Sequence, residues 1–186
     1  MSDRPVFPEV RITAERVVLR QFTLADLDDL QRMGADERSQ YWTTLPSPYT
    51  LDNARQWALE QAPAIREHGA GIVFAIADCE SDRLLASIDL KGTDWVTRVT
   101  EVGYMTAPWA RGRGYAAEAA HALGRWALLD QRFERLELKA ATGNHASQRV
   151  AEKAGFTREG VLRNAGVTKN DRVDLAMFSL VPDDLP

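Results

Sequence analysis

The chain has 186 residues, of which 45% are hydrophobic and 27% are charged, as in an ordinary water-soluble globular protein. Its 27 acidic and 23 basic residues leave a net charge of −4, which argues against binding nucleic acid through overall charge. One cysteine and three histidines without ligand spacing exclude an internal disulfide and a cysteine-rich metal site. No apolar run suits a signal peptide or a membrane span, so we expect a cytoplasmic protein without metal, nucleic acid or membrane partners.

The first third of the chain predicts one strand and two helices. Residues 16–22 are rich in Val and Leu, which is typical of a strand. Apolar residues at helical spacing predict a helix over 23–33, with a threonine as its N-cap. Two prolines and three aromatic residues in 38–49 predict an ordered loop. Thr50 then caps a second helix, which we expect Pro63 to kink or end.

From residue 71 onward the apolar pattern changes to the alternation of strands. The predicted elements are strands 71–79, 83–92 and 97–107, helix 115–129, strand 132–142, helix 146–154, and strands 156–164 and 172–180. The element order is β-α-α-β-β-β-α-β-α-β-β, and no linker divides it. We therefore predict a single domain over residues 1–186, with its core at about 10–181. Its fold class is α/β (α+β), with a mixed, mostly antiparallel sheet of about seven strands and about four flanking helices.

The segment 100–129 carries the clearest functional pattern. A strand leads through Pro108 into Arg-Gly-Arg-Gly at 111–114, and a helix begins directly afterwards. Glycines leave backbone N–H groups bare at a helix N-terminus, where the positive end of the helix dipole favours phosphate. The two arginines add mobile positive charge. A simple glycine turn with two solvated arginines would have the same sequence.

Two kinds of phosphate site fit this pattern. Gly112, Gly114 and Ala117 match the bare dinucleotide-binding spacing, which would indicate an NAD(P)-dependent oxidoreductase. Four residues separate the strand from that turn, and Gly103 interrupts the strand, which is unlike a buried parallel strand. The preceding strands also form an antiparallel run and not a βαβ unit. The context therefore favours another kind of phosphate site.

The same segment resembles the GNAT superfamily of acyl-CoA-dependent N-acyltransferases. Arg111, Gly114 and Ala116 match its pyrophosphate signature, Arg/Gln-x-x-Gly-x-Gly/Ala, and the predicted element order also matches. The chain is most similar to the RimJ/RimL-type branch, which acetylates N-terminal amines of ribosomal proteins. The stretches that carry this similarity, within about residues 10–181, are 19–20, 101–104, 144–147, 152–156, 159–160, 162–163 and 178–180.

The resemblance implies a GNAT fold that is splayed between the fourth and fifth predicted strands, with acetyl-CoA as cosubstrate. Backbone groups of Tyr104, Met105 and Thr106 would pair with the pantetheine arm in this gap. An amide near Met105 would polarise the thioester carbonyl. Gly103 would mark a bulge that opens the sheet. The residues implied for the pyrophosphate are Arg111, Gly112, Arg113, Gly114, Tyr115 and Ala116.

Asn144 and Ser147 are implied both for catalysis and for binding the cofactor arm. Asn144 would hydrogen-bond that arm, although it would equally serve as a cap for the following helix. Many GNAT enzymes have a proton-donating tyrosine where this chain has Ala151, and the RimJ/RimL branch is thought to use the serine instead. An aliphatic hydroxyl is too weak an acid to protonate a thiolate whose conjugate acid has a pKa of about 8.5. We therefore expect Ser147 to donate a hydrogen bond to sulfur and to contribute modestly.

Direct acetyl transfer requires a neutral amine, and Glu101 is implied as the base that supplies it. Asp89 is a weaker candidate, and a salt-bridged strand residue is the alternative role for Glu101. Roughly a tenth of an N-terminal amine is already neutral at pH 7, so it needs less help than a lysine. His145 is expected to be an exposed loop residue, and Cys79 a buried apolar residue that carries no acyl group.

These features predict an acetyl-CoA-dependent N-acetyltransferase that acts on a primary amine by direct transfer in a ternary complex. The amine would be a protein or peptide N-terminus or a small molecule. A non-catalytic acyl-CoA-binding or regulatory module is the alternative, and a homodimer is expected from the branch. We expect the acceptor pocket near residues 38–50, the second helix and residues 90–98. Its candidate lining residues are Tyr41, Trp42, Trp95 and Arg98.

Overall fold

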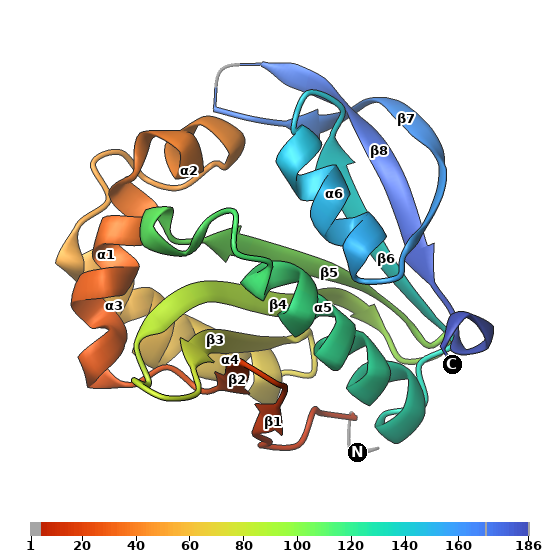
Figure 1. Ribbon diagram of the computed structural model, residues 1–186, viewed down its shortest axis with the longest axis horizontal. Helices are drawn as coiled ribbons and strands as arrows, with labels where there is room; N and C mark the ends of the chain where they lie inside the picture. Colours follow the sequence, from red (N-terminus) through yellow and green to blue (C-terminus); the bar gives the residue numbers. More distant parts are fainter. Residues whose placement is uncertain (1–4, 170, 186) are drawn as a thin grey trace.

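A computed structural model describes residues 5–169 and 171–185, and eight strands in these ranges form one sheet of order β1-β2-β3-β4-β5-β6-β8-β7 (Figure 1). All neighbouring strands are antiparallel except β5 and β6, which run parallel. The predicted mixed, mostly antiparallel sheet is confirmed, with one short edge strand more than expected. The strands are β1 (Ile12–Thr13), β2 (Val17–Arg20), β3 (Ile72–Asp78), β4 (Leu84–Asp94), β5 (Val99–Thr106), β6 (Arg135–Ala141), β7 (Thr157–Val167) and β8 (Arg172–Leu180).

The helices of the described residues form about five segments, because α3, η2 and α4 are continuous, as are α5 and η4. None of these helices is both long and apolar enough to cross a membrane. The main helices are α1 (Leu27–Ala35), α2 (Glu37–Trp42), α3 (Leu51–Gln56), α4 (Ala62–Glu67), α5 (Tyr115–Arg125) and α6 (His145–Lys153). The short or π-helical segments are η1 (Leu24–Asp26), η2 (Trp57–Gln61), η3 (Pro108–Ala110), η4 (Trp126–Asp130) and η5 (Pro182–Asp184).

Two helical regions differ from the prediction. The first part of the expected loop over 38–49 is helix α2, because the Asp36 side chain accepts a hydrogen bond from the N–H of Ser39 and caps the helix. Pro63 does not end the second helix. The helical backbone continues through Pro63. The wider π turn of η2 comes just before it and changes the hydrogen-bond pattern, so that the missing N–H of proline is tolerated.

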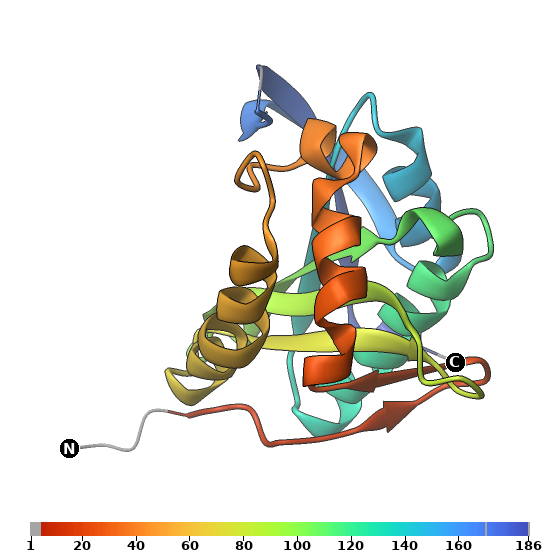
Figure 2. The same ribbon diagram turned by 90° about the vertical axis from the view of Figure 1, so that its left-hand side faces the viewer.

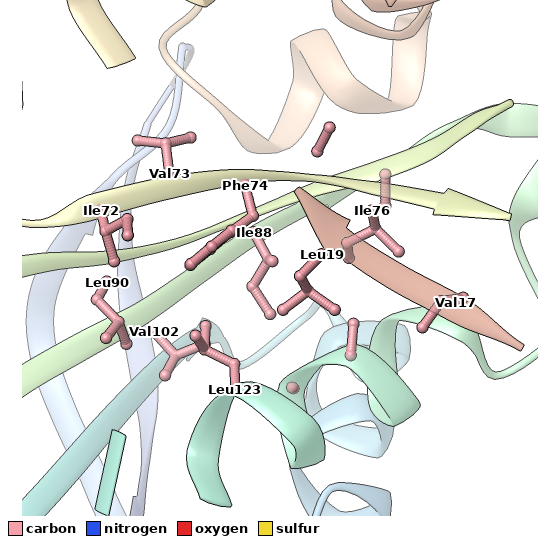
Figure 3. Packing of buried hydrophobic residues seen from close by; sticks show 14 of the residues in the cluster. Val17, Leu19, Ile72, Val73, Phe74, Ile76, Ile88, Leu90, Val102 and Leu123 are labelled. Atoms are coloured by element: carbon pink, nitrogen blue, oxygen red, sulfur yellow. The ribbon is translucent and has the colours of Figure 1, made fainter. Parts of the chain in front are cut away.

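Helices cover both faces of the β2–β5 part of the sheet. Figure 2 shows α3 and α4 on one side of these strands and α5 on the other. On the α5 side, Leu19, Ile88 and Val102 are fully buried and lie toward Leu123 of α5, whereas Val73 points to the opposite face (Figure 3). This alternation follows from the period of two along each strand. Each such side chain stabilises the fold by about 1.5–3 kcal/mol.

The two parallel strands at the centre of the sheet separate after four residue pairs. Val99–Val102 of β5 pair with Arg135–Leu138 of β6, but β5 continues to Thr106 without β6 as a partner. The rest of β6 pairs only with β8. The splay predicted from the resemblance is therefore confirmed, and it leaves one side of the end of β5 unpaired. We refer to the space beside this end of β5 as the gap.

The prediction that Gly103 forms a bulge is wrong. Gly103 pairs with Asp89 of β4 in regular register, and the irregularity between β4 and β5 lies between Lys91 and Asp94. A Cβ atom at Gly103 would lie 2.3 Å from the Oδ1 atom of Asp89. Glycine therefore leaves room here for the ends of the Asp89 and Lys91 side chains.

A buried ion pair joins β2 to the helix that follows it. Arg20 is 7% exposed, and its two terminal nitrogens donate to the Asp26 carboxylate at 2.8 and 3.0 Å. The Nε atom donates to the exposed carboxylate of Asp82 at 2.8 Å, and the carbonyl of Gln21 accepts a further bond. Buried charges are tolerated when their hydrogen-bonding groups are satisfied in this way.

Replacing Asp26 should therefore be far more costly than replacing Asp82. We expect Asp26→Asn to lower the free energy of unfolding by about 3–5 kcal/mol, because it leaves a buried guanidinium without its principal counter-charge. The matched change Asp82→Asn removes a carboxylate that is 64% exposed and should cost less than about 1 kcal/mol. Urea denaturation of both variants checks this, and equal losses would contradict the assignment.

Candidate functional site

A cavity of about 480 Å³ lies beside the unpaired end of β5, between α2, the start of α5 and α6. It brings together all but one of the residues that the sequence predicted for the cofactor. Arg113 is the exception, since it lies outside the cavity lining and its carbonyl accepts a hydrogen bond from Arg16. The predicted residues that line the cavity are Tyr104, Met105, Thr106, Arg111, Gly112, Gly114, Tyr115, Ala116, Asn144 and Ser147.

The end of β5 presents to the gap backbone groups that no strand pairs with, and of these the Thr106 carbonyl accepts a hydrogen bond from Arg111. Ala107 donates its N–H to the carbonyl of Leu85 at 2.9 Å, and the antiparallel register continues from there without a shift. Backbone groups of successive strand residues point to alternate sides, so the N–H of Met105 points toward β4. The backbone groups of Tyr104 and Thr106 consequently face the gap. The Met105 amide, which the resemblance suggested for the thioester carbonyl, belongs to the β4 side of this ladder.

The glycine turn before α5 exposes a helix N-terminus to the same cavity. Gly112 and Gly114 have φ angles of +77° and +85°, a region that residues with side chains rarely adopt. Gly114 is the N-cap of α5, and the first bond of the helix runs from the N–H of Glu118 to its carbonyl. The preceding N–H groups, including those of Tyr115 and Ala116, have no acceptor within the helix. Such a terminus is suited to an anion.

A rim of basic side chains, which the sequence reasoning missed, adds positive charge to the cavity. It consists of Arg38 from α2 and of Arg149 and Lys153 from α6. Ala146, Arg149, Val150 and Lys153 line the cavity together because their spacing of three or four residues places them on one face of the helix. That spacing is visible in the sequence and would have identified the α6 residues.

Arg111 is held by α2 and is not a mobile cation as expected. Its guanidinium donates to the Asp36 carboxylate and to the Ser39 hydroxyl, and its Nε donates to the Thr106 carbonyl at 3.2 Å. Burial by itself would raise the pKa of Asp36, but the hydrogen bonds from Arg111 and Ser39 outweigh it and lower that pKa below its usual value. Arg111 therefore joins α2 to the glycine turn and to the end of β5.

Ser147 and Tyr104 form a hydrogen-bonded pair in the cavity wall. The Oη atom of Tyr104 lies 2.6 Å from Oγ of Ser147 and donates to the Ser147 carbonyl at 2.9 Å. Burial raises the pKa of Tyr104 to about 12, so its phenol stays neutral. The phenol has one proton, so it donates either to this carbonyl or to Oγ; in the second arrangement the serine proton is free to point into the cavity. The sequence predicted only the backbone of Tyr104, because the partner of its side chain lies 43 residues away.

Asn144 has the capping role, and it also lines the cavity. Its side chain accepts a hydrogen bond from the N–H of Ser147 at 3.2 Å, which fixes the first turn of α6. The neighbouring His145 is exposed, as expected, but it is the first residue of α6 and does not lie in a loop. The capping bond therefore holds Ser147 in place beside Tyr104.

Glu101 lies in a salt bridge and outside the cavity lining. Its Oε1 atom is 3.3 Å from Nζ of Lys91, and its Oε2 atom accepts a hydrogen bond from Lys139 at 2.9 Å. Both carboxylate oxygens are thus engaged by ammonium groups from the two flanking strands. Because strand residues alternate, Glu101 lies on the face of β5 opposite to Tyr104.

The residues expected around the acceptor divide into two places. Trp42 lines the cavity and makes an edge contact with Tyr41 at a ring distance of 4.7 Å. Trp95 is instead packed against Phe7 and Phe133, and the guanidinium of Arg98 lies over its ring. Trp95 is therefore partly buried against the core and lies outside this cavity, so its place in the acceptor pocket stays a prediction.

Cys79 differs from its expected burial. It follows the last residue of β3 in a turn and is exposed. Its backbone N–H donates to the Arg16 carbonyl, so the main chain is held while the side chain remains at the surface. The pattern of the strand ended one residue earlier than the sequence indicated.

The comparisons of this chain with known proteins agree on one family. A model of the acetyltransferase (GNAT) domain matches residues 16–157. The chain is 25% identical over 167 residues to the uncharacterized N-acetyltransferase p20 of Bacillus licheniformis, covering 90% of this chain and 93% of that protein. Each of two solved structures, which share the fold at low sequence identity, extends over nearly all of the chain.

The first of these structures is RimJ of Mycobacterium smegmatis in complex with CoA-disulfide. Its TM-score is 0.86 at 17% identity, covering 96% of this chain and 90% of that one. The second is the ribosomal-protein-S5-alanine acetyltransferase of Vibrio fischeri. Its TM-score is 0.80 at 18% identity, covering 95% of this chain and all of that one.

The Asp36–Arg111 pair predicts that the wild type and Asp36→Asn differ in their free energy of unfolding, and that this difference depends on pH. Asparagine keeps the helix cap but removes the charge that binds Arg111. Because the folded-state pKa of Asp36 is lowered, the pair stabilises the protein fully above the ordinary aspartate pKa of 3.8 and loses this effect as the pH falls below it. Denaturation curves measured across this range should converge at acid pH. A difference that is independent of pH would contradict the pairing.

Proposed function

This chain belongs to the GNAT acetyltransferase family, and from that premise we propose that it moves an acetyl group from acetyl-CoA to a primary amine by direct transfer, with both substrates bound together. The observation that carries the proposal is the joining of the gap beside β5 to the helix N-terminus of α5 in one cavity. A long molecule with an amide-rich arm and a polyphosphate end fits these two features. When bound, acetyl-CoA supplies the activated acetyl thioester.

Each part of the cavity has a proposed task in holding acetyl-CoA. The backbone groups of Tyr104 and the N–H of Thr106 would pair with the amides of the pantetheine arm, as a neighbouring strand would. The N–H groups of the glycine turn and of the start of α5 would bind the pyrophosphate. The basic rim of Arg38, Arg149 and Lys153 supports the same assignment, because it offers cations to the remaining phosphate charge.

The proposed acceptor is an N-terminal amine of a peptide or protein. A protein with the same fold is named a ribosomal-protein-S5-alanine acetyltransferase, which makes a protein acceptor the first to test. The physical reason is that roughly a tenth of such an amine is neutral at pH 7, so only a weak base is required. Small amines remain part of the test panel.

We further propose that Ser147 donates a hydrogen bond to the departing sulfur and that Tyr104 positions its hydroxyl. The proposal is supported by the 2.6 Å contact between their oxygens and by the exposure of both residues to the cavity. With a pKa of about 12, the phenol is a hydrogen-bond donor and not a proton source for a thiolate. The expected contribution is therefore modest.

We also propose that the chain forms a single domain over residues 1–186, that it assembles into a homodimer and that it is located in the cytoplasm. Size-exclusion chromatography tests the dimer, limited proteolysis tests the domain, and fractionation of the source cells tests the location.

Thermal unfolding with acetyl-CoA, CoA or NAD(P)H tests the proposed function. A ligand at 100 times its Kd should stabilise the wild type by about 2.7 kcal/mol, a shift of a few degrees. We expect both CoA species to give this shift and NAD(P)H to give none. Stabilisation by NAD(P)H alone would contradict the proposal, and CoA binding without acetylation of any amine in a panel would indicate a binding module.

Gly114→Ala should weaken the acetyl-CoA shift, because a methyl group would lie where phosphate approaches the backbone. The matched control is Gly92→Ala, since Gly92 also has a positive φ, of +58°, but lies outside the cavity lining. Both variants carry the same backbone strain, of about 1–2 kcal/mol. Equal acetyl-CoA shifts in the two variants would contradict the pyrophosphate assignment.

A double-mutant cycle tests the Tyr104–Ser147 pair. Ser147→Ala should lower kcat by less than about 100-fold, because it removes one hydrogen bond to a fair leaving group. Tyr104→Phe should have a smaller effect, and the double variant should lose no more than Ser147→Ala alone. Steady-state kinetics measures all three, and additive losses would show that Tyr104 does not act through Ser147.

A further inference from the structure

Asp89 has a buried carboxylate oxygen next to Gly103 of β5, outside the cavity lining as Glu101 is. It lies in the middle of β4, and its Oδ1 atom is buried without a well-formed hydrogen bond among the described residues, although the backbone N–H groups of Gly103 and of Asp89 itself lie close enough to lower the pKa of this carboxyl. Buried polar atoms are nearly always paired, and an unpaired one in a native fold needs an explanation. The salt bridges and hydrogen bonds of the site described above do not include it.

The residue of β5 opposite Asp89 is a glycine, so no side chain stands over the Asp89 carboxylate from that position. Asp89 pairs with Gly103, and a Cβ atom there would lie 2.3 Å from Oδ1. Gly103 is also the first residue of β5 beyond its pairing with β6, which ends at Val102. The carboxylate therefore lies against the backbone at the place where the gap begins.

Asp89 and the Tyr104–Ser147 pair lie on opposite faces of the sheet. Asp89 is on the same face as Gly103 and Met105, whereas Tyr104 projects to the α6 side. In acyl transfer the amine enters and the thiol leaves on different sides of the carbonyl carbon. Groups that serve the two partners are thus expected on opposite sides of the gap, as these residues are.

The neighbours of Asp89 distinguish it from Glu101. Val73 of β3 and Gly103 of β5 lie across from it and carry no charge, and its charged neighbours are Lys91 on β4 and Glu101 on β5. Lys91 forms a salt bridge with Glu101 and none with Asp89, although its Nζ atom also lies over Gly103, 3.1 Å from the place of a Cβ atom there. Lys139 holds the other oxygen of Glu101. An incoming amine would have to break these pairs to use Glu101, but not to use Asp89.

We propose that Asp89, and not Glu101, is the catalytic base that takes a proton from the acceptor amine. The proposal rests on the acetyl transfer proposed above. Burial raises the pKa of Asp89; Glu101 reinforces this effect, whereas Lys91 and the backbone N–H groups of Gly103 and Asp89 oppose it. A carboxylate with a raised pKa is a better match for a proton from an amine at neutral pH.

The protons of the reaction balance with this assignment. An ammonium acceptor has three N–H bonds, and the amide product keeps one. One of the two protons lost forms the S–H bond of the released thiol. The other breaks from nitrogen, forms an O–H bond on Asp89 and passes to solvent, which returns the carboxylate to its starting state.

The first test compares pH–rate profiles of kcat/KM for Asp89→Asn and Glu101→Gln, with acetyl-CoA and a short peptide that has a free N-terminal alanine. We expect Asp89→Asn to lose at least about 100-fold and to lack the acidic limb of the profile, while its thermal shift with acetyl-CoA remains. Glu137 on β6 has its carboxylate on the same face of the sheet as Asp89. The variant Glu137→Gln therefore controls for the loss of one negative charge. Removal of the limb by Glu101→Gln, or its persistence in Asp89→Asn, would overturn the proposal.

The second test does not require an acceptor. Because the folded-state pKa of Asp89 is raised, the wild type should lose stability as the pH rises through that window, since the unpaired charge must then be buried. Asp89→Asn should remove this loss and unfold at a higher temperature than the wild type at neutral pH. A variant that is less stable at neutral pH would overturn the proposal, even if the peptide is not acetylated. Failure of acetyl-CoA to stabilise the wild type would instead count against the proposed function.

Discussion

The site depends on a constraint of β-sheet hydrogen bonding: the strand that loses its neighbour keeps backbone groups that need partners. β5 pairs with β6 over four residues and then continues alone to Thr106. Backbone groups left without partners inside a protein are costly, so they are satisfied by water or by a ligand. The glycine turn, the start of α5 and α6 are all placed around this unpaired edge. A ligand that supplies the missing strand edge thus satisfies the sheet and is positioned by it.

The two faces of the sheet at the gap carry different chemistry. On the α6 side, Asn144 caps the helix and holds Ser147 beside the neutral phenol of Tyr104. On the other side, a row of paired charges extends from Lys91 through Glu101 to Lys139, and Asp89 lies next to it without a salt bridge to any described residue. One face is thus suited to donating a hydrogen bond and the other to accepting a proton. The absence of a side chain at Gly103 is what allows Asp89 to approach the strand.

Local patterns in the sequence predicted most of the fold and much of the cavity. The alternation of apolar residues located the strands, and the glycine turn located the start of α5. What the sequence could not predict were contacts between distant segments. The pairing of Tyr104 with Ser147, of Arg111 with Asp36 and of Glu101 with two lysines joins different elements. The helix α2 was missed because a capping aspartate stood just before a segment whose prolines and aromatic residues indicated a loop.

Amide hydrogen exchange at the end of β5 tests the central claim most directly. In the free protein, the N–H groups of Tyr104 and Thr106 should exchange faster than that of Met105, because only Met105 points toward β4. Acetyl-CoA should slow the exchange of Tyr104 and Thr106 and leave Met105 nearly unchanged. If Tyr104 and Thr106 are already as protected as Met105, or if acetyl-CoA protects other segments only, the gap is not the cofactor site.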